Sequence, residues 1–273
     1  MHRVVYTSGS TGESVQLDGD TAFVATGGGL RSRKWTRLLG SRSLRGAALN
    51  AREVKVDCVA YDAAADDLRR IADADVAAKT PGTVMVDGEW KCKCFVVESE
   101  TSEVYYEAVK LKLTVALVDG YWYRDKSKHF VTGLDDGGID HPYDYPHDLS
   151  YVAGKGQLIV ETRLGAKPRI TFYGPVTNPY ITFAGNRYEV DVQVLSGWKV
   201  VIDALDSAPT VRKVDSFGNW TSVFADAVRD GGLGGGSYAF QPIPYGTHEV
   251  TWSGAFAFDI EWREIDTEPP WSS

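Results

Sequence analysis

Histidine and aspartate residues gather in one short stretch of the sequence, GIDHPYDYPHDLSY, which spans residues 138–151. Its candidate ligands for a divalent cation are His141, Asp144, His147 and Asp148. A cation held there would make the chain a metal-dependent hydrolase. Prolines separate the two histidines, however, and the pattern offers no helix or strand to aim them. We therefore favour a connecting segment, and we expect no catalytic residue, metal ligand or cofactor in the chain.

Other patterns that carry chemistry do not occur in the sequence. There is no G-x-S-x-G elbow, no H-E-x-x-H pair and no paired C-x-x-C motif. The stretch RDGGLGGGSYAF lacks the Gly-Lys-Ser/Thr ending of a phosphate-binding loop, and we interpret it as a connection between strands. The cysteines, Cys58, Cys92 and Cys94, are too few for a disulfide framework. They are predicted to be small buried side chains of a protein in a reducing compartment.

The composition is that of a globular, β-rich protein. A length of 273 residues suits one large domain or two smaller ones, and the many aromatic and glycine residues favour strands. The net charge of −8 argues against nucleic acid as the main partner, because phosphate binding needs a basic face. The start MHRVVYTSGS lacks the apolar stretch of a signal peptide, and no run approaches the length of a membrane span. We therefore expect a cytoplasm-like environment and no contact with a membrane.

A local exception to this acidic balance is a basic cluster at residues 31–45, in and just after the loop TGGGLRSRKWTRLLGSRS. The cluster consists of Arg31, Arg33, Lys34, Arg37, Arg42 and Arg45. A run of this kind is either a solvated loop or a binding surface, and the residues alone leave both interpretations open.

Residues 1–125 are predicted to form strands and one helix. The helix is expected in DAAADDLRRIADADVAAKTPG, where Asp62 can cap the first turn and Leu68, Ile71 and Val76 supply an apolar stripe. Further along, AVKLKLTVAL places Val109, Leu111, Leu113, Val115 and Leu117 on one side and Lys110, Lys112 and Thr114 on the other. That alternation indicates a strand with one face buried and one face in water.

The periodicity stops between Arg124 and Gly156, where glycines and prolines interrupt the chain, and we place a linker at residues 126–156. Tyr143, Tyr145 and Tyr151 of this linker are expected to pack on the surfaces of the domains. Residues 157–273 hold about eight short strand candidates separated by turn residues, which predicts a sandwich or a jelly roll. The predicted fold class is therefore mainly β, with two β-sandwich-like domains of which the first has a single α-helix.

Several stretches, taken in order, make the sequence resemble a known family. In the first half they are GGGLRSRKWTRLLGSRSLRGAALNAREVKVDCVAY, TPGTVMVDGEWKCKCFVV and AVKLKLTVALVDGYWY. The segment IDHPYDYPHDLSY follows, and the second half adds NPYITFAGNRYEV, GWKVVIDAL, PIPYGTHEVTWS and IEWREIDTEPPW. Each stretch is unspecific alone. In this order and spacing they resemble, over nearly the whole chain, the distal tail proteins of long, non-contractile-tailed bacteriophages and prophages.

The resemblance implies a structural protein of the virion. Such proteins form a hexameric ring between the tail tube and the tail tip, and the family has no catalytic motif. The resemblance implies that residues 1–125 form the ring and that residues 157–273 are a galectin-like β-sandwich on which adhesion components dock. The implied partners are further copies of the chain, the tail tube protein, a tail-tip or tail-lysin hub protein, and an adhesion or receptor-binding protein. The implied location is the tail tip, after assembly in the host cytoplasm.

A cyclic ring brings one patch of a subunit against a different patch of its neighbour. The basic loop and the acidic helix supply a candidate pair of patches, consisting of Arg31, Arg33, Lys34, Arg37, Asp66 and Asp73. The alternative function is a carbohydrate-binding β-sandwich module, in which Trp198, Trp220 or Trp252 would stack on sugars. The size of the particle separates the two, because a binding module is expected to be a monomer.

Overall fold

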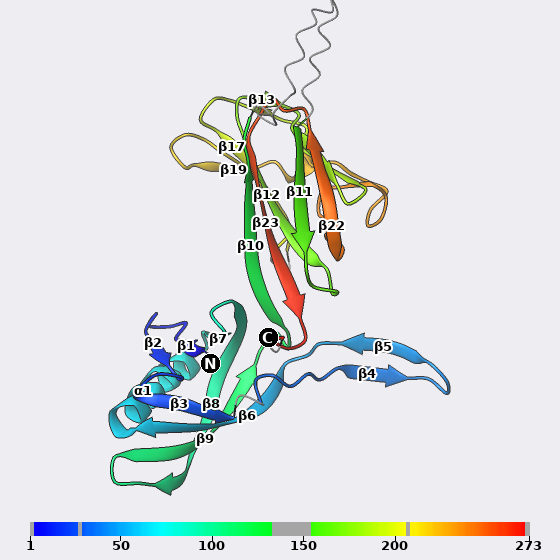
Figure 1. The fold of residues 1–273 in the computed structure, drawn as a ribbon. Helices are drawn as coiled ribbons and strands as arrows, with labels where there is room; N and C mark the ends of the chain where they lie inside the picture. The colour runs from blue at the N-terminus through cyan, green and yellow to red at the C-terminus, as the bar shows by residue number, and fades with distance from the viewer. Residues whose placement is uncertain (1–2, 27–28, 133–153, 206–207, 271–273) are drawn as a thin grey trace, which may run out of the picture. The chain divides into compact units, whose positions relative to one another are not determined.

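The structure is a computed structural model that describes residues 3–26, 29–132, 154–205 and 208–270 (Figure 1). The chain divides into two compact units: unit 1 comprises Met1–Arg124 and Ile265–Ser273, and unit 2 comprises Asp125–Glu264. Strands dominate the described residues, and one α-helix occurs among them. The predicted fold class, mainly β with a single helix, is confirmed.

Unit 1 is an antiparallel sheet with a helix packed against it. Its elements are β1 (Val4–Thr7), β2 (Ser14–Gln16), β3 (Ala22–Thr26), β4 (Thr36–Leu39), β5 (Leu44–Ala48), β6 (Arg52–Tyr61), α1 (Asp62–Ala78), β7 (Gly82–Val86), β8 (Trp90–Val104) and β9 (Ala108–Leu117). Hydrogen bonding orders the strands β2–β1–β7–β8–β9–β6–β3, while β4 and β5 pair only with each other. The strand β10 (Trp122–Phe130) begins in unit 1, where Tyr123 pairs with Lys91 of β8.

Alternation along β6 and β9 builds the core of unit 1. The two strands pair from Arg52 opposite Leu117 to Tyr61 opposite Ala108, so their apolar residues fall on one face. The buried residues of these strands are Val54, Val56, Cys58, Ala60, Leu111, Leu113, Val115 and Leu117. Cys92 and Cys94 of β8 lie in the same core, which confirms the prediction of buried cysteines.

The helix α1 adds Leu68 and Ile71 to this core, as the apolar stripe predicts, whereas Val76 is exposed. The helix begins at Asp62, so the N-cap position belongs to Tyr61, which makes no side-chain capping hydrogen bond. The N-cap position therefore lies one residue before the one expected from the sequence. At the other end, Lys79 takes a left-handed conformation and its N–H bonds the carbonyls of Asp75 and Val76, which ends the helix.

Unit 2 is a sandwich of two sheets. Its elements after β10 are β11 (Gly154–Val160), β12 (Ala166–Tyr173), β13 (Val176–Thr177), β14 (Tyr180–Phe183), β15 (Asn186–Glu189), β16 (Gln193–Val194), β17 (Lys199–Asp203), β18 (Thr210–Val214), β19 (Trp220–Ser222), the 3-10 turn η1 (Phe224–Asp226), β20 (Arg229–Asp230), β21 (Ser237–Tyr238), β22 (Gly246–Trp252) and β23 (Phe258–Asp266). One sheet runs β19–β18–β17–β12–β23 and the other β11–β22–β14–β15. Their inner faces meet in a core that includes Phe172, Ile202, Phe258, Leu158, Ile181 and Val250.

The chain passes between the two units at other positions than the expected linker, residues 126–156. The chain passes from unit 1 to unit 2 inside β10, between Arg124 and Asp125, and β10 continues to Phe130. The strand β11 begins at Gly154, so both ends of the expected linker 126–156 belong to strands of unit 2. The last part of the chain, Ile265–Ser273, belongs to unit 1 and not to the second domain.

Candidate interaction surfaces

The hairpin β4–β5 is an arm of unit 1 (Figure 1). It carries Arg37, Arg42 and Arg45 of the basic cluster, and Arg33 and Lys34 come just before it in the chain. Thr36 lies opposite Ala48 and Leu39 opposite Leu44, and the N–H of Gly40 closes the turn on the carbonyl of Ser43 at 2.7 Å. Every residue of both strands is exposed. The arm therefore has no core of its own, and neither of its faces is covered within the described part of unit 1.

The arm exposes leucines as well as charges. The exposed fractions are 64% for Leu38, 63% for Leu39 and 60% for Leu44. Arg33, Lys34 and Arg37 are also exposed, as the surface interpretation requires. An isolated two-stranded hairpin is only marginally stable in water, and its free edges offer hydrogen-bonding groups to another chain. The leucines were not singled out from the sequence, although the run Leu38-Leu39 before a Gly-Ser turn was a signal for them.

Arg31 does not belong to this surface, which corrects the expectation drawn from the basic loop. The residue is only 4% exposed, and its guanidinium forms an ion pair with Asp87. It also donates hydrogen bonds to the carbonyls of Pro269, at 3.3 Å, and of Pro270. Arg31 is thus an internal clamp that holds residues 269–270 to the turn after β7. A planar guanidinium suits this task because its donors reach several acceptors at once.

The acidic residues of the predicted patch lie on the exposed side of α1. Asp66 and Asp73 are both exposed, and Asp66 lies 3.8 Å from Arg69 in an i,i+3 ion pair. Among the described residues, no ion pair joins this helix to the arm. The structure therefore leaves both charged patches accessible but does not bring them together within one chain.

A buried carboxylate ties the first residues of the chain to the end of α1. Asp75 is fully buried and accepts hydrogen bonds from the hydroxyls of Tyr6, Ser8 and Ser10 at 2.6, 2.7 and 2.6 Å. The N–H groups of Ser10 and Gly9 donate at 2.9 and 3.3 Å. Burial alone raises the pKa of a carboxyl, but the bonds from Ser10, Tyr6 and Ser8 outweigh it and lower the pKa of Asp75 to about 2.

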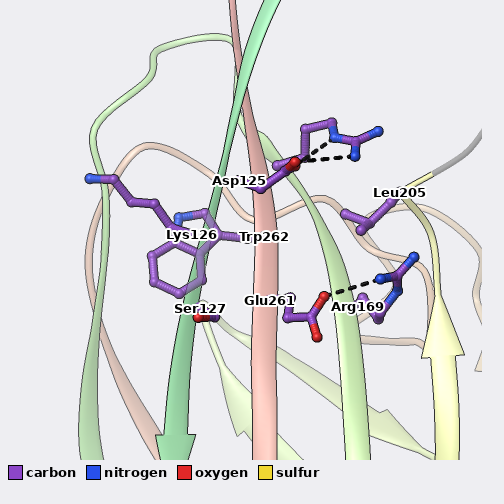
Figure 2. A pocket seen from close by; sticks show the side chains of 8 residues that line it. Asp125, Lys126, Ser127, Arg169, Leu205, Glu261 and Trp262 are labelled. Carbon is purple, nitrogen blue, oxygen red and sulfur yellow. Dashed lines mark hydrogen bonds and ion pairs between the residues drawn. The ribbon is translucent and has the colours of Figure 1, made fainter. Parts of the chain in front are cut away.

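Unit 2 carries a polar face on the outer side of its larger sheet. Arg169 of β12 donates to Asp203 of β17 at 2.9 Å and to Glu261 of β23 at 3.1 Å. Figure 2 shows Arg169 reaching Glu261 beside a cavity of about 260 Å³, which Ser127 and Trp262 also line. Arg263 holds Asp125 at 2.7 Å in the same cavity. The side chains of this face are thus fixed by one another.

The three candidate tryptophans have different environments. Trp252 is buried in the core of unit 2, and Trp198 is partly buried and packed against that core, so both serve the packing of the sandwich. Trp220 of β19 is 58% exposed, and the guanidinium of Arg212 lies 4.7 Å from the centre of its ring. Only Trp220, of these three, offers a ring face to a ligand.

The stretch 138–151, with His141, His147, Tyr143, Tyr145 and Tyr151, lies outside the residues that the structure describes. In the described part of the chain, no group of three or more His, Cys, Asp or Glu side chains is arranged to hold a metal ion. In that same part, no helix has the length and apolar character needed to cross a membrane.

Comparison with solved structures identifies the fold. The Dit (gp 19.1) protein of phage SPP1, described as a paradigm of the hub adsorption apparatus in phages that infect Gram-positive bacteria, superposes with a TM-score of 0.57 at 12% identity. The match covers 96% of this chain and 99% of that one.

A chain of the phage P2 baseplate in its activated conformation with calcium gives a TM-score of 0.55 at 10% identity, over 98% of this chain and 100% of that one. The same baseplate with strontium gives 0.54 at 10% identity, with the same coverage. No family model matches the sequence, and no curated protein matches it. The resemblance to phage distal tail proteins is therefore confirmed at the level of the fold: along nearly its whole length, this chain has the fold of phage tail hub and baseplate proteins.

Proposed function

We propose that the chain is a structural component of a phage or prophage tail, not an enzyme, and that six copies form a hub ring at the distal end of the tail tube. Support comes from the fold, which it shares with hub and baseplate proteins over 96% or more of its length. In this proposal unit 1 forms the ring and contacts the tail tube protein. Unit 2 presents the surface for tail-tip, tail-lysin and adhesion or receptor-binding proteins. Assembly takes place in the host cytoplasm.

The observation that carries the ring is the uncovered arm β4–β5. Leu38, Leu39 and Leu44 lie in water in the single chain, and burial of one leucine side chain contributes about 1.5–3 kcal/mol. A hairpin with apolar side chains and free edges gains this free energy only when another molecule covers it. A second copy of the chain is the partner that a closed ring supplies to every arm alike.

Charge complements this contact. Arg37 lies on the arm and Arg33 and Lys34 come just before it, whereas the exposed side of α1 carries Asp66 and Asp73. These patches have opposite sign and lie on different elements of unit 1. A head-to-tail contact in a ring joins unlike patches of this kind, and the contact is expected to weaken as salt rises.

The test is the mass of the purified chain, measured by light scattering and native mass spectrometry and checked by negative-stain images. We expect a particle of six times the chain mass of 29.9 kDa, with a ring shape in the images. Leu38→Ser combined with Leu44→Ser should shift the mass toward that of the single chain. Leu164→Ser, a change at an exposed leucine of unit 2, is the matched control and should leave the mass unchanged.

Reversal of charge provides a second, independent test. Arg33→Glu with Lys34→Glu should weaken the oligomer most at low salt, because screening shortens the range of the attraction. Arg31 is left out of this test because its charge is buried. A chain that stays monomeric at the highest soluble concentration, or an oligomer indifferent to both sets of changes, would contradict the proposed ring contact.

A further inference from the structure

A second cavity, of about 530 Å³, lies on the polar face of unit 2 beside the one in Figure 2. Its volume falls within the range of about 300–1,000 Å³ that is typical of sites for small ligands. Arg169 and Glu261 line both cavities, so the two hollows share one wall. The strands β23, β12, β17, β18 and β19 supply its lining in their order across the sheet. The site is thus built on a rigid sheet, which holds side chains more precisely than loops do.

The floor of this cavity holds hydrogen-bonding groups in fixed positions. Asp203 and Glu261 clamp Arg169 from both sides, so its guanidinium is ordered before any ligand arrives. Glu261 uses Oε2 for this contact, and its Oε1 makes no hydrogen bond within the described part of the chain. The hydroxyl of Thr171 and the ammonium of Lys199, which also line the cavity, likewise make no hydrogen bond within the described part of the chain. The cavity therefore presents both acceptors and donors that are free to bind.

An aromatic ring stands at the edge of this floor. Trp220 lines the cavity from β19, where it pairs with Val214 of β18, and more than half of its surface is exposed. Arg212, two residues before Val214 on β18, lies 4.7 Å from the centre of the ring and restrains it. An exposed ring held in this way is a platform for the apolar C–H face of a ligand.

We propose that this face of unit 2 binds a neutral oligosaccharide that reaches from Glu261 on β23 to Trp220 on β19, a span of four strand spacings or roughly 19 Å. A sugar hydroxyl both donates and accepts hydrogen bonds, and the cavity offers Glu261 as acceptor and Thr171 and Lys199 as donors. A sugar ring also has a C–H face that stacks on an indole such as Trp220. A phosphate-rich ligand fits less well, because Asp203 and Glu261 already occupy the guanidinium of Arg169. The proposal is independent of the role in the tail, since it rests on unit 2 alone.

The test begins with the full chain on an array of neutral oligosaccharides built from glucose, galactose, mannose and N-acetylglucosamine. The strongest binder is then titrated by isothermal calorimetry and by tryptophan fluorescence. We expect saturable binding that changes the emission of the wild-type protein. Trp220→Ala should weaken the affinity about tenfold or more, a change of about 1.4 kcal/mol. Glu261→Gln should weaken it as well, while Arg169 keeps its bond to Asp203.

Matched controls separate binding from folding. Tyr245→Ala removes another exposed aromatic ring of unit 2, and Glu249→Gln neutralises an exposed glutamate of the opposite sheet. Both should bind like the wild type, and all variants should keep its melting temperature within error. Absence of binding to every saccharide would overturn the proposal. So would binding that survives Trp220→Ala, or binding that inorganic phosphate abolishes at constant ionic strength, because an anion site would then explain it.

Discussion

The carboxylate of Asp75 should be the most sensitive single position in unit 1. It is fully buried, and five hydrogen-bond donors from residues 6–10 converge on its two oxygens. The change Asp75→Asn keeps the size of the side chain and removes the charge and one acceptor. An amide that keeps its oxygen beside Ser8 and Ser10 must turn its NH₂ group toward Tyr6 and Gly9. The Tyr6 hydroxyl can then rotate to accept, whereas the N–H of Gly9 loses its acceptor.

The magnitude follows from these bonds. A hydrogen bond to a charged group contributes about 1.5–3 kcal/mol and one between neutral groups about 0.5–1.5 kcal/mol. Three bonds to Oδ1 lose the assistance of charge, and one weak bond to Oδ2 is lost. Because bonds to one oxygen are not additive, we expect a loss of about 2–4 kcal/mol in the free energy of unfolding. Such a loss lowers the melting temperature by about 10 °C for a domain of this size.

The sign of the pH dependence is fixed by the lowered pKa. Asp75 has a pKa of about 2 in the folded protein and the usual value of 3.8 when unfolded. Its ionised form therefore stabilises the fold above pH 3.8, and this contribution is lost as the pH falls from 3.8 to about 2. The difference in stability between the wild type and Asp75→Asn should be full at pH 7 and should shrink below pH 4.

The assay is urea unfolding at several pH values, joined with hydrogen exchange of the amides of β1. Asp73→Asn is the control, because it neutralises an exposed aspartate of the same helix. Its unfolding midpoint should match that of the wild type. The reasoning is refuted if Asp75→Asn unfolds at the wild-type midpoint at pH 7, or if the two variants lose the same stability. It is also refuted if the loss stays constant down to pH 2.

Three further predictions follow from the same contacts. Arg31→Lys should speed hydrogen exchange at residues 265–268, because a single ammonium nitrogen replaces the two guanidinium nitrogens that reach Asp87 and the two carbonyls separately; unchanged exchange would exclude the clamp. Gly82→Ala should lower the melting temperature, because its new Cβ would lie 2.5 Å from the Tyr6 hydroxyl oxygen; a neutral effect in calorimetry would contradict this close packing. Native protein should not react with a thiol reagent at pH 8, whereas unfolded protein should react with three equivalents of the reagent. The reason is that burial raises the pKa of the thiols of Cys58, Cys92 and Cys94. A thiol that reacts before the protein unfolds would contradict this burial.

The sequence predicted correctly those parts of the fold in which buried residues recur at the regular spacing of a single strand or helix. The alternation in AVKLKLTVAL placed β9, and the spacing of Leu68 and Ile71 placed the inner side of α1, because each pattern is set by a single element. The cysteines were placed in the core for the same reason. The predicted break after Arg124 coincides with the change of unit, but the strand β10 crosses it without interruption. A strand whose two ends lie in different units has no single buried face. Its sequence therefore shows no regular alternation of apolar and polar residues.

The candidate sites were predicted less well, because their environment depends on residues distant in the sequence. Arg31 and Arg33 stand two positions apart in one basic run, yet Arg31 is buried and Arg33 is exposed. The difference comes from Asp87 and Pro269, which lie 56 and 238 residues away from Arg31. A charge pattern says nothing about such partners. For the same reason Arg169, Asp203 and Glu261 were not singled out, since only the register of three strands brings them together.

The two candidate surfaces differ in what they need from a partner, and this difference makes them separable. The arm β4–β5 has no buried residue, so its order depends on the molecule that covers it. The polar face of unit 2 is already ordered, because Arg169 is held by its own chain and Phe172 and Ile202 anchor the strands beneath it. Leu38→Ser should therefore change the assembly and leave saccharide binding intact, whereas Trp220→Ala should do the reverse. If either change affected both measurements, the two surfaces would be coupled, and the assignment of separate roles to them would be wrong.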